Sequence, residues 1–322
     1  MKLIKYFSYI LIILTLSFVL PRIIPGSPLH LSDSDTYALN TRLPMESFSL
    51  YEEYYAPDKP LVQQFIIYIR NLAKLDLGYS FYYKMPVGEL LFSRIAWTIF
   101  LSVTSIIISS IVGIRLGLNT ALNTDEKIKN AALISFTSIQ AVPAFIMAVL
   151  IQLLLSYKLN LFPSSGAYSA GVEFFTFNFF VDVIVHSILP LITLVIIEIP
   201  SIFLLTYNVA SRIKKSNYVK MAYYLNINHK IIQDKYIFIN SIPEILGKLN
   251  IQFLYAISGT LFVEAVFSYP GMGMFLKTAA VNNDYPLLQG ILLFIGIYGI
   301  LINGVFENLI KRYSPRISDE NN

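Results

Sequence analysis

Six long runs of apolar residues follow one another along the chain, and the segments between them carry most of the charged residues. The runs cover about residues 5–24, 95–118, 131–157, 183–209, 249–267 and 285–306. Bilayer hydrocarbon is about 30 Å thick, so a spanning helix needs roughly 17 to 25 mostly apolar residues. Because backbone groups inside lipid must form their hydrogen bonds within the segment, each run predicts a transmembrane helix. The pattern therefore predicts an all-α integral membrane protein with six transmembrane helices.

The composition agrees with this fold class and argues against disulfides, metal sites and nucleic-acid binding. Hydrophobic residues make up 55% of the chain and charged residues 14%, against about 25% charged residues in soluble domains. There is no cysteine, which excludes disulfides and thiolate metal sites. His30, His186 and His229 have no metal-ligand spacing, so no metal site is predicted. The net charge of +4 is too small and too scattered to suggest nucleic acid as a partner.

The positions of lysine and arginine predict the orientation in the membrane. With both termini inside, the inner segments hold fourteen basic residues and the outer segments eight, and basic residues near spans favour the cytoplasm. We therefore expect a multi-pass protein of the cell membrane with both termini cytoplasmic. Two lysines precede the first run, but Pro21–Gly26 lacks a small-x-small cleavage pattern, so we interpret this run as a retained anchor.

Two segments between the runs are large enough to form structure outside the membrane. Residues 28–94 combine acidic residues with tyrosines and predict a small external cap. Residues 211–248 hold seven bases and two acids, a net charge of +5, and predict the main cytoplasmic surface. We divide the chain into an N-terminal end with the first helix (1–27), an extracytoplasmic region (28–94), a membrane core (95–317) and a tail (318–322).

Sequence motifs for catalysis are missing. The chain has no glycine-rich loop ending in Gly-Lys-Ser or Gly-Lys-Thr, no His-Glu-x-x-His and no Gly-x-Ser-x-Gly, so we expect neither an ATPase nor another enzyme. Two glutamates lie within the runs. We interpret Glu198 as a hydrogen-bonded structural residue beside Pro200, with a functional role as the alternative, and Glu264 as an interfacial carboxylate. His186 beside Ser187 has no acid partner that would make a catalytic set.

A short amphipathic helix is predicted within the inner segment. Tyr218, Met221, Ala222 and Leu225 fall on one helical stripe. Asn226 follows, and asparagine tolerates the left-handed conformation that ends many helices. A helix that only anchors to lipid headgroups is the alternative to a protein-binding helix.

This segment resembles the coupling loop of the membrane subunits of ABC importers, in the dipeptide, oligopeptide and nickel permease family. Tyr218, Val219 and Ala222 match the family pattern, and Lys220 matches it conservatively. Tyr224, Leu225 and Asn226 depart from it. The resemblance implies an ATPase-coupling helix made of Tyr218, Val219, Lys220, Met221, Ala222, Leu225 and Asn226.

Residues 259–273 are similar to the same family almost position by position. The matching residues are Gly259, Glu264, Phe267, Pro270, Gly271 and Gly273 at the end of the fifth span, and Asp284, Tyr285 and Pro286 at the start of the sixth. Proline and glycine at 270–273 should end a helix and allow a turn. Asp284 ahead of Pro286 predicts a helix start. Residues 25–28, 76–81, 161–166, 186–190 and 315–316 also agree with the family, whereas Arg115 stands where it usually has proline.

The resemblance implies one half of a translocation pore, with alternating access driven by ATP. The implied partners are a second homologous permease, two ABC ATPase subunits or domains, an extracytoplasmic substrate-binding protein and membrane lipid. It implies no cofactor bound by this chain, because ATP and Mg would bind to the ATPases. The family transports dipeptides, oligopeptides, nickel and metal chelates. A secondary transporter or channel driven by an ion gradient is the alternative, although charged groups in the spans are sparse.

Overall fold

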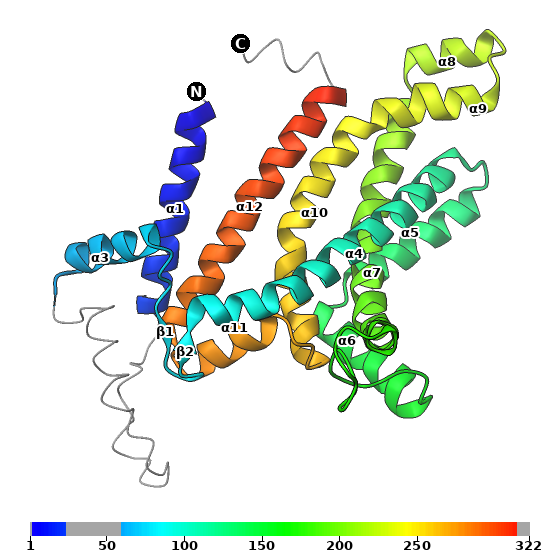
Figure 1. Ribbon diagram of the computed structural model, residues 1–322. Coiled ribbons are helices and arrows are strands. Elements are labelled where there is room, and N and C mark those ends of the chain that lie inside the picture. Colours follow the sequence, from blue (N-terminus) through cyan, green and yellow to red (C-terminus); the bar gives the residue numbers. More distant parts are fainter. Residues whose placement is uncertain (1, 24–58, 314–322) are drawn as a thin grey trace. The chain divides into compact units, whose positions relative to one another are not determined.

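The computed structural model describes residues 2–23 and 59–313, and these form two compact units. The first unit comprises the described residues up to Thr98 together with Pro270–Ile300. The second comprises Ile99–Tyr269 together with the described residues from Leu301 onward. The fold class predicted from the apolar runs is confirmed, since helices dominate both units (Figure 1).

The first unit contains α1 (Lys2–Ile23), α3 (Leu61–Ala73), the strands β1 (Tyr79–Ser80) and β2 (Met85–Pro86), the start of α4 (Val87–Leu122), α11 (Met272–Val281) and most of α12 (Tyr285–Tyr313). The two strands pair antiparallel. Helix α3 runs across α1 (Figure 1), and an aromatic contact between Phe18 and Phe65 joins the two helices, with ring centroids 5.1 Å apart. Ser17 and Tyr68 add a hydrogen bond of 2.7 Å between their hydroxyl oxygens.

The second unit contains the rest of α4 and α12 and eight further elements. These are α5 (Glu126–Gln140), α6 (Ala144–Ile151), the π-helix η1 (Gln152–Lys158), α7 (Phe177–Lys214), α8 (Asn217–Tyr224), α9 (His229–Ile231), the π-helix η2 (Ile232–Phe238) and α10 (Ile239–Val266). Helix α7 packs against α5, α6 and α10. Gly117 of α4 lies so close to α7 that a Cβ would be 2.8 Å from the Phe203 oxygen, as in membrane helix pairs with small residues at the contact.

Five helical stretches of the described residues are long and apolar enough to cross a bilayer, and a sixth is a bent pair. The pair is α5 followed by α6 and η1, with a 97° bend between Gln140 and Ala144. The sequence predicted one continuous helix over 131–157, so the continuity of this span was wrong. Pro143 explains the break, because proline lacks an N–H and moves the preceding residue out of the helical conformation.

Other boundaries also differ from the sequence pattern. Helix α4 begins at Val87 rather than at Ile95, and an unbroken helical stretch from His229 to Val266 includes much of the predicted inner segment. Within the predicted external cap, residues 59–94 form α3, the β1–β2 hairpin and the first turns of α4. The remainder of the cap up to residue 58, the 25–28 match, His30 and the 315–316 match lie outside the described residues.

Candidate functional site

The amphipathic helix predicted in the inner segment is α8, which follows α7 after only Lys215 and Ser216. Its end is closed by Asn226, whose φ is +54°. The Asn226 N–H donates to the Tyr223 carbonyl at 3.0 Å, and the Ile227 N–H donates to the Ala222 carbonyl at 3.1 Å. This pair of bonds is a Schellman motif. The predicted left-handed conformation of Asn226 is therefore confirmed.

One face of α8 is buried in the second unit. Val219 and Ala222 are 0% and 2% exposed, and they pack in a cluster with residues of α4, α7 and η2, namely Ala121, Ala210, Ile232 and Ile237. Burial of this face fixes α8 to three other elements. Displacing α8 would therefore disturb the packing of all three.

The opposite face of α8 carries large apolar side chains that are exposed. Tyr218, Met221, Tyr224 and Leu225 are 46%, 57%, 82% and 63% exposed, and we call them the outer face of α8. The predicted stripe is thus divided, because Ala222 points into the core while Tyr218, Met221 and Leu225 do not. The small Val219 and Ala222 fit against neighbouring helices, which leaves the bulky residues outside.

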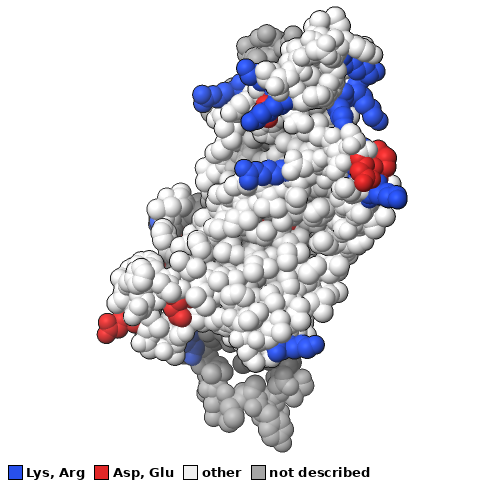
Figure 2. Space-filling view, turned by 90° about the vertical axis from the view of Figure 1, so that its right-hand side faces the viewer, with Lys and Arg blue, Asp and Glu red and all other residues white. Residues whose placement is uncertain are grey.

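Exposed basic residues lie on α8 and on the segments that flank it in the chain, α9 and η2 included. They are Lys215, Lys220, Lys230 and Lys235, and Figure 2 shows blue side chains gathered in the upper part of the view, where Figure 1 places α8 and α9. An apolar face with a basic surround suits a partner with an apolar groove and acidic edges.

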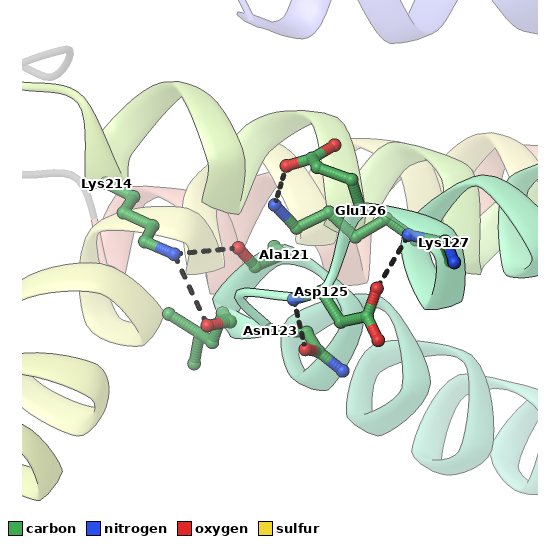
Figure 3. A network of polar contacts seen from close by, with 8 residues as sticks. Ala121, Asn123, Asp125, Glu126, Lys127 and Lys214 are labelled. Carbon is green, nitrogen blue, oxygen red and sulfur yellow. Dashed lines mark hydrogen bonds and ion pairs between the residues drawn. The ribbon is translucent and has the colours of Figure 1, made fainter.

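Lys214, the last residue of α7, ties that helix to the end of α4 (Figure 3). Its Nζ donates to the carbonyl oxygens of Ala121 at 3.2 Å and Leu122 at 3.3 Å. A lysine at the last carbonyls of a helix satisfies acceptors that have no partner within it. The neighbouring turn is closed by Asp125, whose side chain accepts from the Lys127 N–H at 2.8 Å and caps α5. Sequence reasoning did not single out Lys214, because its partners are backbone atoms 92 and 93 residues away.

The fifth-span motif begins in the second unit, at the end of α10. Glu264 is fully buried, as are Phe267 (1% exposed) and Tyr269 (0%). Tyr269 shares a 2.9 Å hydrogen bond with Ser187, and burial raises the pKa of its hydroxyl to about 12. The Gly166 N–H donates to the Phe267 carbonyl at 2.9 Å. Three segments that matched the permease family therefore meet here.

Helix α10 ends close to residue 267, where the fifth apolar run was predicted to end. Its C-cap is Phe267, and Ser268 has the left-handed φ of +46°. The Tyr269 N–H closes the end by donating to the Glu264 carbonyl at 2.9 Å. The helix thus stops before Pro270 and the glycines, as the predicted end of the fifth run indicated. Gly259, within α10, faces open space.

In the first unit, the rest of the motif starts a new helix. Gly271 is the N-cap of α11, and Gly273 lies in its first turn. The Met272 N–H donates to Thr98 Oγ1 at 2.9 Å, and Arg94 Nη1 donates to the Pro270 carbonyl at 3.3 Å.

Asp284 caps α12, as its place before Pro286 predicted. Its Oδ1 accepts from the Leu287 N–H at 3.4 Å, and Tyr285 is the first residue of the helix. Its Oδ2 accepts from Ser80 Oγ and, at 3.3 Å, from the Tyr82 N–H. Burial raises the pKa of the Asp284 carboxyl, although these donors oppose the shift. The matches at 76–81 and 284–286 are thus in contact.

Glu198 is buried between α7 and α4. Its carboxylate accepts from Ser105 Oγ at 3.2 Å and from Ser109 Oγ at 2.9 Å, which confirms the interpretation of a hydrogen-bonded residue. The two serines were missed, although their spacing of four residues places them on one helix face.

His186 and Ser187 have separate partners. His186 Nδ1 lies 2.9 Å from the Asp182 backbone carbonyl oxygen and 3.4 Å from the carboxylate oxygen Asp182 Oδ1, an acidic neighbour that the sequence analysis did not name. Ser187 Oγ instead donates to the Val183 carbonyl at 2.6 Å. Within residues 2–23 and 59–313, no group of three or more His, Cys, Asp or Glu side chains could hold a metal.

Comparison with known proteins places this arrangement in a family. Residues 113–319 match the model of the family "Binding-protein-dependent transport system inner membrane component". The oligopeptide transport system permease protein OppB of Haemophilus influenzae is 26% identical over 98% of this chain and 97% of that protein. The dipeptide transport system permease protein DppB of Bacillus subtilis is 26% identical over 96% and 93%. The glutathione transport system permease protein GsiC of Pectobacterium atrosepticum is 25% identical over 96% and 94%.

The fold also resembles a solved structure. A chain of the MetNI methionine ABC transporter, in an inward-facing conformation, matches it with a TM-score of 0.57 at 13% sequence identity. The match covers 70% of this chain and 96% of the transporter chain.

Proposed function

Because this chain belongs to the family of binding-protein-dependent transport system inner membrane components, we propose that it is the permease subunit of an ATP-driven importer of peptides. The substrate class is supported by relatives named for oligopeptide, dipeptide and glutathione transport. Nickel or a metal chelate is the less favoured cargo, since no metal-binding cluster lies among the described side chains.

The observation that carries this proposal is the two-sided packing of α8. Val219 and Ala222 hold the helix to the membrane core, while Tyr218, Met221 and Leu225 offer an apolar surface to a partner. An amphipathic helix that lays such a face into a groove is a common mode of protein recognition. We assign the groove to a separate ABC ATPase, which binds ATP and Mg, while this chain binds no cofactor and catalyses no reaction.

The mechanism follows from the connections of α8. Closing of two ATPases would move α8, and the short link at Lys215–Ser216 would pass that movement to α7. The bonds from Lys214 to the end of α4, and from Ser105 and Ser109 to Glu198, would make α4 follow α7. The paired helices would then open the pore alternately to each side of the membrane.

The proposal requires further subunits. A second permease of the same family would complete the pore, and an extracytoplasmic binding protein would deliver the peptide. With both termini cytoplasmic, α8 would lie on the side where the ATPases bind. Selection of the peptide would rest mainly with the binding protein.

Replacing Met221 by aspartate tests the role of the outer face of α8. The side chain is 57% exposed, so Met221→Asp should leave folding and membrane insertion intact. A charge buried in an apolar groove costs well over the 1.4 kcal/mol that corresponds to about tenfold in affinity. We expect substrate-stimulated ATP hydrolysis and peptide uptake by the reconstituted complex to fall at least about tenfold.

Two variants serve as controls for this experiment. Met221→Leu keeps an apolar side chain and should keep uptake. Gln233→Asp adds the same charge at an exposed position of η2 and should also keep uptake. Undiminished uptake by Met221→Asp would contradict the proposed coupling role.

A further inference from the structure

An apolar cavity of about 550 Å³ lies within the first unit, inside the roughly 300–1,000 Å³ range of small-molecule sites. Its walls come from α1, α3, residues 75–77 after α3, the start of α4 and α12. Thirteen of its fifteen lining residues are Leu, Ile or Phe, and the other two are Gly88 and Gly290. An apolar cavity of this kind does not hold ordered water, so an apolar ligand is the natural occupant.

The cavity is open to its surroundings. Two of its lining side chains, Leu75 and Phe92, are 89% and 85% exposed. Three of the walls, α1, α4 and α12, belong to helices long and apolar enough to span a bilayer. The medium around such helices is lipid hydrocarbon, so an opening between them faces acyl chains.

Helix α3 marks the depth of the cavity in the membrane. Gln64 accepts a 3.2 Å hydrogen bond from Arg22 Nε, and Tyr68 bonds to Ser17, so α3 is held at the last two turns of α1. Leu61, Val62 and Ile66 of α3 are 60–71% exposed. An amphipathic helix at the end of a spanning helix lies in the membrane interface. The cavity beneath it is then at the depth of the acyl chains.

The end of α3 supplies apolar side chains that suit a lipid acyl chain and basic side chains that suit a lipid phosphate. Leu72 and Leu75 line the cavity, while Arg70 and Lys74, one helical turn apart, are exposed. Leu75 has a φ of +61°, a conformation that is unfavourable for a bulky residue and is often retained where function requires it. Cationic side chains at this depth attract phosphate groups.

We propose that this cavity binds one acyl chain of a membrane phospholipid whose phosphate lies against Arg70 and Lys74. The site is independent of the transport role, since none of its residues belongs to α8 or to the α4–α7 pair in the second unit. The bound lipid would fill space between α1, α3 and α12 that protein side chains leave open.

Filling the cavity from Gly88 tests the proposal. A Cβ at Gly88 has no atom within 4 Å, so Gly88→Phe should fold and place its ring in the cavity. Native mass spectrometry of the complex purified in detergent should find one retained phospholipid per copy of this chain. We expect Gly88→Phe to lower that occupancy at least fivefold.

The matched control is Gly247→Phe, because a Cβ at Gly247 of α10 also meets nothing within 4 Å. This variant should retain the phospholipid. Equal occupancy in Gly88→Phe and wild type, no retained lipid in wild type, or a retained mass of a free fatty acid or detergent alone would each overturn the proposal.

A photo-crosslinker at the cavity distinguishes lipid from protein as the occupant. Benzoylphenylalanine in place of Phe92 should form an adduct with the mass of a phospholipid on irradiation of membranes that contain the complex. The same group in place of the buried Phe179, 8% exposed in the second unit, should form none. A crosslink from position 92 to another protein subunit, or no adduct, would contradict lipid binding.

Discussion

Several helices of this protein end on left-handed residues other than glycine. Asn226, Ser268 and Asn283 have φ values between +46° and +54°, and the following N–H in each case bonds back to the last turn. Residues with a Cβ adopt this conformation at a cost of roughly 1–2 kcal/mol, which asparagine reduces through its short polar side chain. Position 226 is therefore one where the free energy of the helix end can be changed without touching the exposed outer face of α8.

Substitutions at Asn226 should change the order of α8 in opposite directions. Asn226→Gly should stabilise the helix end by up to about 1 kcal/mol, and Asn226→Val should destabilise it by about 1–2 kcal/mol. Hydrogen–deuterium exchange of the amides of 226 and 227 should be slower in the glycine variant and faster in the valine variant. Faster exchange in Asn226→Gly would contradict this account of the turn.

Asp284 should make the stability of the first unit depend on pH. Because burial raises its pKa in the folded protein, the folded state binds the proton more tightly than the unfolded state. The contribution of the protonated Asp284 carboxyl to the free energy of unfolding is complete below the ordinary carboxyl pKa. It is lost as the pH rises through the raised pKa of the folded protein. The thermal midpoint of the purified protein should fall over this window, and Asp284→Asn should remove that slope.

The control for Asp284 is Asp234→Asn, at an exposed carboxylate of η2. It should leave the pH slope of the thermal midpoint as in wild type. A slope that persists unchanged in Asp284→Asn would show that another group causes it.

Among the elements, α4 and α7 approach each other closely at two glycines of α4. A Cβ at Gly113 would lie 3.0 Å from the Ile202 side chain, and one at Gly117 would lie 2.8 Å from the Phe203 oxygen and Thr206 Cβ. Close backbone approach, rather than apolar area, stabilises helix pairs in lipid. Glu198 adds hydrogen bonds from Ser105 and Ser109 to the same pair.

Replacing Gly117 by leucine should force these helices apart. Because the blocking atoms include backbone, the clash cannot be relieved by rotating a side chain, and overpacking of this kind costs on the order of 1–3 kcal/mol. The folded yield and thermal midpoint should both fall. Gly247→Leu, where nothing lies within 4 Å, should change neither; a Gly117→Leu protein as stable as wild type would refute close α4–α7 packing.

The sequence predicted the membrane elements well because lipid imposes one strong requirement, a long apolar helix. The sequence could not place the bend at Pro143, because a straight helix and a broken helix have the same uncharged, apolar pattern. It missed the starts at Val87 and His229, where polar residues continue a helix beyond the hydrocarbon. The contact of Ser80 with Asp284 joins residues 204 apart, and periodicity carries no information about such pairs.

For the site, the sequence located α8 and its end but not the direction of its faces. Tyr218, Met221, Ala222 and Leu225 share a stripe, and only the packing around Val219 and Ala222 decides which part of it is buried. The role of Lys214 could not be predicted for a related reason. Its partners are backbone carbonyl groups, which every residue has, so the sequence does not mark them.

At the scale of the whole molecule, the proposed transport function depends on a separate ATPase subunit. The proposed ATPase partner is supported by the permease family to which the chain belongs and by the exposed apolar outer face of α8. Because the chain has no cysteine, a single introduced cysteine can report on its contacts without a background.

Crosslinking from α8 in the intact complex tests the central claim most directly. A cysteine in place of Tyr224, 82% exposed, should crosslink to an ABC ATPase subunit identified by mass spectrometry, whereas one in place of Ala222, 2% exposed, should not. Adding Met221→Asp should abolish the Tyr224→Cys crosslink. If Tyr224→Cys forms no crosslink to an ATPase in a complex that imports peptide, α8 is not the coupling element and the account is wrong.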